Sequence, residues 1–140
     1  MLPPAKTDAE QFEGLLYRAR KQFQRSASRA HVCSLSCRTL VYKALCVGGQ
    51  LSHIFTDLED PLYESALAIF HQRYSTNTLP SWPLAQPFRF LAHNGEINTL
   101  WANRSWMRAR EALIPADLRP VVTVEASDSS NLDEAFELLL

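Results

Sequence analysis

Residues 71–99 read His71-Gln-Arg-Tyr-Ser-Thr-Asn-Thr-Leu-Pro-Ser-Trp-Pro-Leu-Ala-Gln-Pro-Phe-Arg-Phe-Leu-Ala-His-Asn-Gly-Glu-Ile-Asn-Thr99. Three prolines lie between positions 80 and 87, and proline does not fit a central strand because it has no N–H to donate. We therefore expect a long ordered loop over 75–87. The apolar residues at 88–93 then predict a short strand, and a helical pattern begins at Glu96.

Apolar periodicity on both sides of this stretch predicts further elements. Thr7 and Glu10 form a capping box, and the apolar residues that follow at helical spacing predict a helix over 8–25. The pattern that begins at Glu96 predicts a helix to Leu113, and residues 127–130 supply a turn and cap for a last helix over 131–140. Runs of β-type residues predict four more strands, at 31–36, at 38–43, at the start of 65–74 and at 121–124.

The composition excludes several classes of function. The 140 residues suit one ordinary domain, and 14 basic against 15 acidic residues give a net charge of -1. That balance argues against binding to nucleic acid or to an anionic membrane surface. No apolar stretch approaches the ~18–20 residues that a membrane span needs. The four glycines are scattered, so the sequence contains no phosphate-binding glycine loop and no dinucleotide fingerprint.

The cysteines and histidines indicate neither a metal site nor a disulfide framework. Cys33, Cys37 and Cys46 are odd in number, and their spacing is not that of a zinc site. The four histidines are scattered along the chain, with no two at positions i and i+4. We therefore expect no bound metal and a reducing compartment, the cytoplasm.

Three polar clusters each follow an apolar run, where side chains are held on rigid elements. They lie at 71–76, 93–96 and 127–129. Arg73 can grip a carboxylate with two parallel hydrogen bonds, and Asp128 can take an ammonium group. Asn94 and Gly95 offer a side-chain amide and an accessible backbone N–H, which suit an oxyanion hole. Together they indicate an amino-acid site for acyl transfer, although singly they also fit a structural arginine and a simple Asn-Gly turn.

Residues 71–99 closely resemble the glutaminase domain of glutamate synthase large subunits, which is a class II glutamine amidotransferase. The triplet His93-Asn-Gly is shared by the wider class. Glu96-Ile-Asn-Thr99, Asn103 and Trp106-Met-Arg-Ala-Arg-Glu111 narrow the resemblance to glutamate synthases. Residues 33–43 and 127–133 are similar to the same family, so the resemblance covers roughly residue 8 to the end.

The resemblance implies a fold and a role for each candidate residue. The family fold is α+β, a four-layer α/β/β/α sandwich of the N-terminal-nucleophile hydrolase type, of which this chain would form a part. Arg73 is expected to hold the α-carboxylate of glutamine and Asp128 its α-ammonium. Asn94 and Gly95 are expected to form the oxyanion hole for the tetrahedral intermediate.

The family nucleophile is a cysteine at the mature N-terminus, whose thiol attacks the amide while its own amine acts as base. Here residue one is Met1, and the three cysteines are expected to be internal buried or loop thiols. We therefore expect residues 1–140 to form an incomplete type 2 amidotransferase domain that is inactive alone. Ala44 and Ala102 stand where the family usually has glycine, and alanine would be strained there if φ were positive.

By resemblance, the full-length form hydrolyses glutamine to glutamate and ammonia, and the ammonia aminates 2-oxoglutarate with the help of FMN and an iron–sulfur cluster. Neither cofactor has an expected site in these residues. The expected partners are L-glutamine, the remaining synthase domains and a small subunit or ferredoxin, and the electron donor stays open between NADPH, NADH and ferredoxin. Two alternatives also stay open: a catalytically dead glutamine-binding module, and a remnant that does not fold alone.

Overall fold

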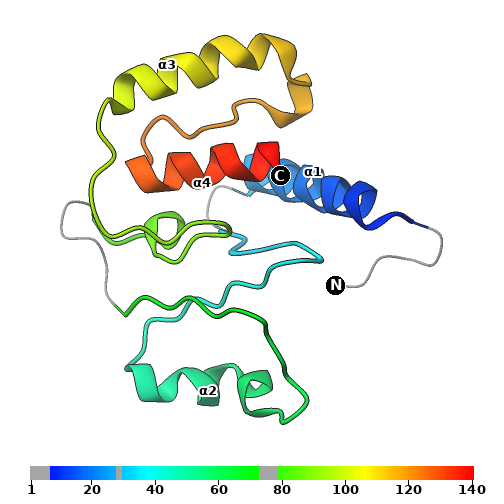
Figure 1. Ribbon diagram of the computed structural model, residues 1–140, viewed down its shortest axis with the longest axis vertical. Helices are drawn as coiled ribbons and strands as arrows, with labels where there is room; N and C mark the ends of the chain where they lie inside the picture. The colour runs from blue at the N-terminus through cyan, green and yellow to red at the C-terminus, as the bar shows by residue number, and fades with distance from the viewer. Residues whose placement is uncertain (1–6, 28–29, 73–78) are drawn as a thin grey trace.

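The described part of the chain is helical in the computed structural model, which describes residues 7–27, 30–72 and 79–140. Its α-helices are α1 (Ala9–Ser26), α2 (Leu51–Ile54), α3 (Leu100–Arg110) and α4 (Asp128–Leu139). Its short 3-10 helices are η1 (Gly48–Gln50), η2 (Thr56–Glu59), η3 (Trp82–Leu84), η4 (Glu111–Leu113) and η5 (Ala116–Leu118). In Figure 1, α3 lies above α4, α1 lies beside α4, and α2 lies at the opposite end of the molecule.

No strand forms within the described ranges, so the expected α+β sandwich is wrong. The predicted strands are extended or irregular instead, at 31–36, 38–43, 88–93, 121–124 and the described part of 65–74. A strand needs a neighbour that accepts its backbone N–H groups. Here side chains accept them: Val41 donates to Ser34 Oγ at 2.9 Å and Leu91 to Asp133 Oδ1 at 3.1 Å. The β-type composition therefore marks extended or irregular chain rather than a sheet.

The prediction of a helix over 8–25 is confirmed by α1, which ends at Ser26. Its cap is Asp8 rather than Thr7, because the Asp8 carboxylate accepts from the N–H of Glu10 at 3.2 Å and of Gln11 at 3.4 Å. The predicted loop is also confirmed over its described part, since residues 79–87 contain only the short turn η3.

The sequence pattern predicts that this helix begins at Glu96, but α3 begins at Leu100. The N–H of Ile97 donates to the Asp128 carboxylate at 2.6 Å, which holds this segment outside the helix. Thr99 then turns the chain into α3 with φ 57° and ψ 32°, a left-handed conformation. Thr99 is the one described non-glycine residue with positive φ, so Ala44 and Ala102 are not strained by lacking glycine.

A small core lies where α1 and α4 meet the connecting segments 85–88 and 118–122. Its buried apolar side chains are Leu16, Ala85, Phe88, Leu118, Val121 and Val122. Charged side chains also lie in this core: Arg20 of α1 pairs with Glu137 of α4, and Arg89 lies 3.5 Å from Glu137 and 3.7 Å from Asp133. The core therefore ties α1 and the segment around residue 89 to one helix, α4.

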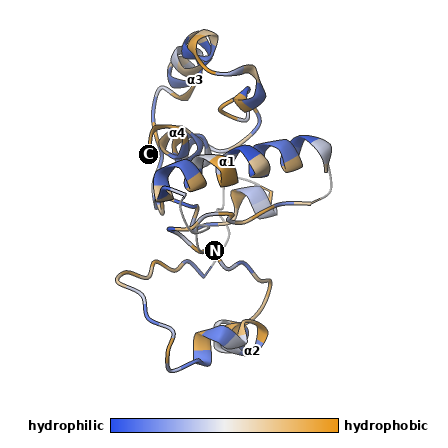
Figure 2. Cartoon of the chain, turned by 90° about the vertical axis from the view of Figure 1, so that its right-hand side faces the viewer, coloured by the Kyte–Doolittle hydropathy of each residue, from blue (hydrophilic) through white to orange (hydrophobic). Residues whose placement is uncertain are grey.

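The part of the chain around α2 is arranged differently. Figure 2 shows α2 apart from α1, α3 and α4, joined to them by extended chain. Every residue of 61–70 is exposed, including apolar side chains such as Leu62, Leu67 and Phe70. Among the described residues, no helix is both long and apolar enough to cross a membrane.

Candidate functional site

The candidate site is built on the N-terminus of α4. Ser127 caps this helix, since its Oγ accepts from the N–H of Ser130 at 3.1 Å. The cap places Asp128 in the first turn, where a carboxylate is favoured by the helix dipole. Asp128 Oδ1 accepts from the N–H of Ser129 at 2.6 Å, and Oδ2 accepts from the N–H of Ile97 at 2.6 Å. Asp128 thereby joins α4 to the segment 93–97.

These contacts also set the charge of Asp128. Burial by itself would raise the pKa of this carboxyl group, yet the pKa lies below its usual range. The hydrogen bonds from Ile97 and Ser129, with a smaller contribution from His93, favour the ionised form and outweigh burial. Asp128 is therefore a carboxylate at neutral pH, as an ammonium partner must be.

Asn94 and Gly95 lie between two points at which their segment is tied to α4. His93 Nδ1 lies 3.3 Å from Ser129 Oγ on one side, and Ile97 meets Asp128 on the other. A Cβ atom at Gly95 would lie 3.3 Å from Cε1 of the His93 ring, so a larger residue would have to displace that ring. Both Asn94 and Gly95 are exposed residues.

The structure thus brings together three of the four predicted site residues, Asn94, Gly95 and Asp128, on neighbouring segments. The fourth, Arg73, lies outside the described residues. Its described neighbour Gln72 approaches η1 closely, since a Cβ at Gly48 would lie 3.0 Å from Gln72 Nε2.

An open cavity of about 320 Å³ lies between α3 and α4 and reaches Asp128. Two polar residues in its lining, Arg104 and Asn131, were not predicted from the sequence as site residues. Arg104 Nε donates to Asn131 Oδ1 at 2.7 Å, and Asn131 Nδ2 donates to the Thr123 carbonyl at 2.8 Å. This pair fixes α3 against α4, and no local pattern around either residue marks the contact.

The described residues do not fit the iron–sulfur cluster that the resemblance implies for a full-length synthase. An iron–sulfur cluster needs cysteine thiolates, yet the Cys37 thiol contacts Glu13 Oε2 at 3.0 Å, and that hydrogen bond raises its pKa. No group of three or more His, Cys, Asp or Glu side chains in the described ranges is placed to hold a metal ion. Cys33, Cys37 and Cys46 are free thiols.

Comparisons with a family model and with known proteins both point to glutamine amidotransferases and glutamate synthases. The family described as "Glutamine amidotransferases class-II" matches residues 2–140. The chain is 47% identical over 144 residues to the NADPH glutamate synthase large chain of Azospirillum brasilense, covering 94% of this chain and 10% of that protein. It is 47% identical over 151 residues to the chloroplastic ferredoxin-dependent glutamate synthase of Oryza sativa subsp. japonica, covering 97% of this chain and 9% of that protein. The chain therefore spans about a tenth of the length of these relatives.

Proposed function

The chain belongs to the class-II glutamine amidotransferases, and on that premise we propose that it forms the glutamine-binding part of the glutaminase domain of a glutamate synthase. Residues 1–140 are then an incomplete type 2 amidotransferase domain. One observation carries the proposal: the N-terminus of α4 holds Asp128 against the segment that contains Asn94 and Gly95. The names of the relatives support the same assignment.

Asp128 is the proposed partner of the α-ammonium group of glutamine. An ionised carboxylate has about four lone-pair sites. The N–H of Ile97, the N–H of Ser129 and the Ser129 hydroxyl occupy three of them. One site is left for the substrate ammonium, on a side chain that also lines the cavity between α3 and α4.

Asn94 and Gly95 are the proposed oxyanion donors. When a thiolate attacks the substrate amide, negative charge develops on the carbonyl oxygen, and fixed N–H donors stabilise it. Loss of one such donor typically slows the reaction ~10²–10³-fold. Arg73 is proposed to hold the α-carboxylate, as a bidentate arginine would. The carboxylate, ammonium and amide of glutamine would then each have a partner.

The activity of the whole protein is part of this proposal. We propose that the full-length form hydrolyses glutamine to glutamate and ammonia and passes the ammonia to a synthase centre that aminates 2-oxoglutarate. FMN and an iron–sulfur cluster would belong to other domains of that form. Identity at 47% to both an NADPH and a ferredoxin-dependent relative supports either electron donor equally. The free thiols support a reducing location such as the cytoplasm.

A second candidate function is glutamine binding without turnover by this chain. The thiols of Cys33, Cys37 and Cys46 belong to internal residues, which have no free α-amine to act as base. We expect the 140-residue chain to bind glutamine and to release no ammonia from it. Thiol-dependent ammonia release by the purified chain would contradict this expectation.

The binding role is tested by isothermal titration with two ligands that differ in one group. L-Glutamine has the α-ammonium, and glutaramate is the same molecule without it. A charge-assisted hydrogen bond contributes about 1.5–3 kcal/mol, so we expect the chain to prefer glutamine roughly 10–100-fold. The variant Asp128→Asn is expected to lose most of this preference.

The matched control is Glu125→Gln, which removes one exposed carboxylate from the loop before α4. This variant should keep the preference of the unmodified chain for glutamine. Absence of glutamine binding would overturn the proposal. An undiminished preference in Asp128→Asn would remove Asp128 from its proposed role.

A further inference from the structure

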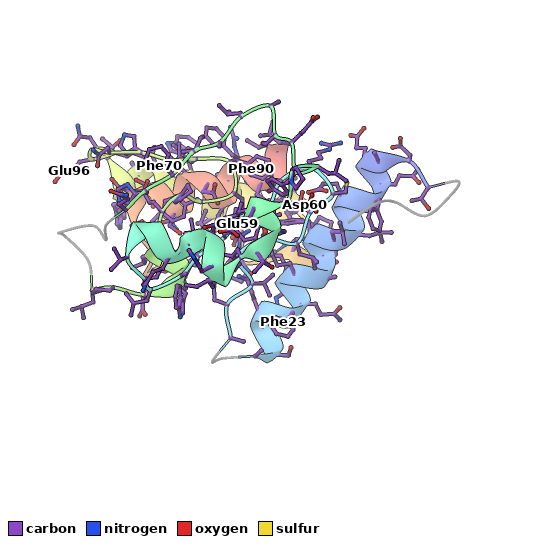
Figure 3. All side chains as sticks on the ribbon, turned by 90° about the horizontal axis from the view of Figure 1, so that it is seen from below. Phe23, Glu59, Asp60, Phe70, Phe90 and Glu96 are labelled. Atoms are coloured by element: carbon purple, nitrogen blue, oxygen red, sulfur yellow. The ribbon has the colours of Figure 1, made fainter. Side chains whose placement is uncertain are left out.

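Helix α4 contacts the segment 88–97 at two successive places along its length. Asp128 and Ser129, at its N-terminus, meet Ile97 and His93. One turn further on, Asp133 Oδ1 accepts from the N–H of Phe90 at 2.7 Å and from the N–H of Leu91 at 3.1 Å. Figure 3 shows Phe90 beside α4 and Glu96 at the outer end of the same segment. The helix therefore holds the chain on both sides of Asn94 and Gly95.

The place of Asp133 in the core makes this contact unusual. Asp133 is 1% exposed, and a buried carboxylate is costly unless its oxygens are satisfied. The N–H groups of Phe90 and Leu91 both donate to Oδ1, whereas Oδ2 lies 3.7 Å from Arg89 Nη1. The two oxygens thus have separate functions: Oδ1 anchors the backbone, and Oδ2 faces a cation.

We propose that Asp133 is a positioning residue, whose Oδ1 fixes the segment 90–97 and so sets where Asn94 and Gly95 present their donors. This inference rests on the proposed function, because Asn94 and Gly95 are the proposed oxyanion donors. Catalytic groups must be held within roughly 0.5 Å of their working positions by such supporting contacts. Leu91 is three residues before Asn94, and Ile97 is two residues after Gly95, so the two anchors leave only a short span free.

Two substitutions separate the position of Oδ1 from the charge of the side chain. Asp133→Asn keeps an oxygen at Oδ1 and removes the charge, whereas Asp133→Glu keeps the charge and moves the oxygen by one methylene. If Oδ1 is the anchor, Asp133→Asn should leave the amide NMR signals of Asn94 and Gly95 near their original positions. Asp133→Glu should move them and speed hydrogen exchange at Phe90 and Leu91 by roughly 10–100-fold.

The control is Glu137→Gln, which weakens the same buried ion network without touching the N–H groups of Phe90 and Leu91. It should lower stability and leave the Asn94 and Gly95 signals in place. The proposal is overturned if Glu137→Gln moves those signals as far as Asp133→Glu, if Asp133→Asn moves them equally, or if Asp133→Glu leaves them unchanged. These signals are recorded without glutamine, so a failure of glutamine binding and a failure of this inference are distinguishable.

Discussion

Two phenylalanines show how differently the two parts of this molecule are built. Phe88 is 6% exposed and lies two residues before Phe90, which α4 holds through Asp133, whereas Phe70 is 82% exposed in the extended chain that leads away from α2. Both belong to runs that the sequence predicts as strands, and neither run forms a ladder.

The two runs differ in whether a neighbouring helix accepts hydrogen bonds from their backbone N–H groups. Next to Phe88, Asp133 accepts two backbone N–H groups and Arg89 donates to the Val32 carbonyl at 2.8 Å. Side chains of α4 and of the segment itself therefore take the place of a strand partner. Residues 61–70 have no such helix beside them, and their apolar side chains face water. In these two runs, apolar side chains are buried where α4 accepts hydrogen bonds from the backbone, and apolar content alone does not bury them.

The largest expected effect comes from truncating the two phenylalanines. Phe88→Ala should lower the free energy of unfolding by about 4 kcal/mol, because it removes a buried ring and leaves a cavity. Phe70→Ala should change it by less than about 0.5 kcal/mol, since the ring is already exposed. Urea unfolding followed by circular dichroism measures both values, and equal losses would end the distinction between the two regions.

A second comparison is between the buried ion pair of Arg20 with Glu137 and the exposed ion pair of Arg18 with Asp117. Glu137→Ala should cost about 3 kcal/mol, because it leaves Arg20, 3% exposed, without its carboxylate partner. Asp117→Ala breaks the pair with Arg18, whose side chains are 47% and 54% exposed, and should cost less than about 1 kcal/mol. Urea unfolding followed by circular dichroism measures both losses of stability. A small loss in Glu137→Ala would show that the network does not hold α1 to α4.

The pH dependence of stability should report on His31. Burial, with smaller contributions from the cations Lys43, Arg89 and Arg20, lowers the pKa of His31 to about 4, against about 6.5 in an unfolded chain. The unfolded state then binds the proton more tightly, so stability should fall as the pH drops from about 6.5 towards 4. His31→Gln should reduce this fall, and His53→Gln, at an exposed position, should not. Identical pH profiles for the two variants would contradict the expectation.

The smallest expected effect is a gain at Thr99. A β-branched residue in the left-handed region carries strain, and glycine adopts φ 57° without it. Thr99→Gly should therefore raise the free energy of unfolding by about 1 kcal/mol. Thr56→Gly, in η2, has no such strain to relieve and should destabilise the chain. Thermal unfolding of the two variants gives the sign of each change.

The sequence predicted those features that depend on neighbouring residues along the chain. The helix α1 follows from apolar spacing. Residues 127–130 were expected to supply a turn and cap before a helix over 131–140; the cap is Ser127, and α4 begins three residues earlier than expected, at Asp128. The sheet could not be predicted correctly, because a strand depends on a partner that local composition does not specify. The start of α3 was missed for the same reason, since Asp128, distant in sequence, takes the N–H of Ile97.

The candidate site was predictable in part. Asn94, Gly95 and Asp128 were singled out by their chemistry and by family resemblance, and the structure places their segments in contact, while their roles stay predictions. Asp133 was missed because its side chain acts through the backbone of residues 90 and 91, and an aspartate on a helix gives no sign of such a contact.

The bond between Asp128 and Ile97 has one more consequence. A single carboxylate both lines the cavity and restrains the segment that contains Asn94 and Gly95. A cation on the free lone pair of Asp128 draws negative charge away from the oxygen that accepts from the Ile97 N–H, so cation binding should weaken the hydrogen bond that restrains residues 93–97. Thermodynamic linkage makes this reciprocal: if binding of an ammonium ligand at Asp128 favours release of residues 93–97 by some factor, release of that segment raises the affinity for the ligand by the same factor. Binding of the ammonium group at Asp128 and the position of Asn94 and Gly95 would then be coupled.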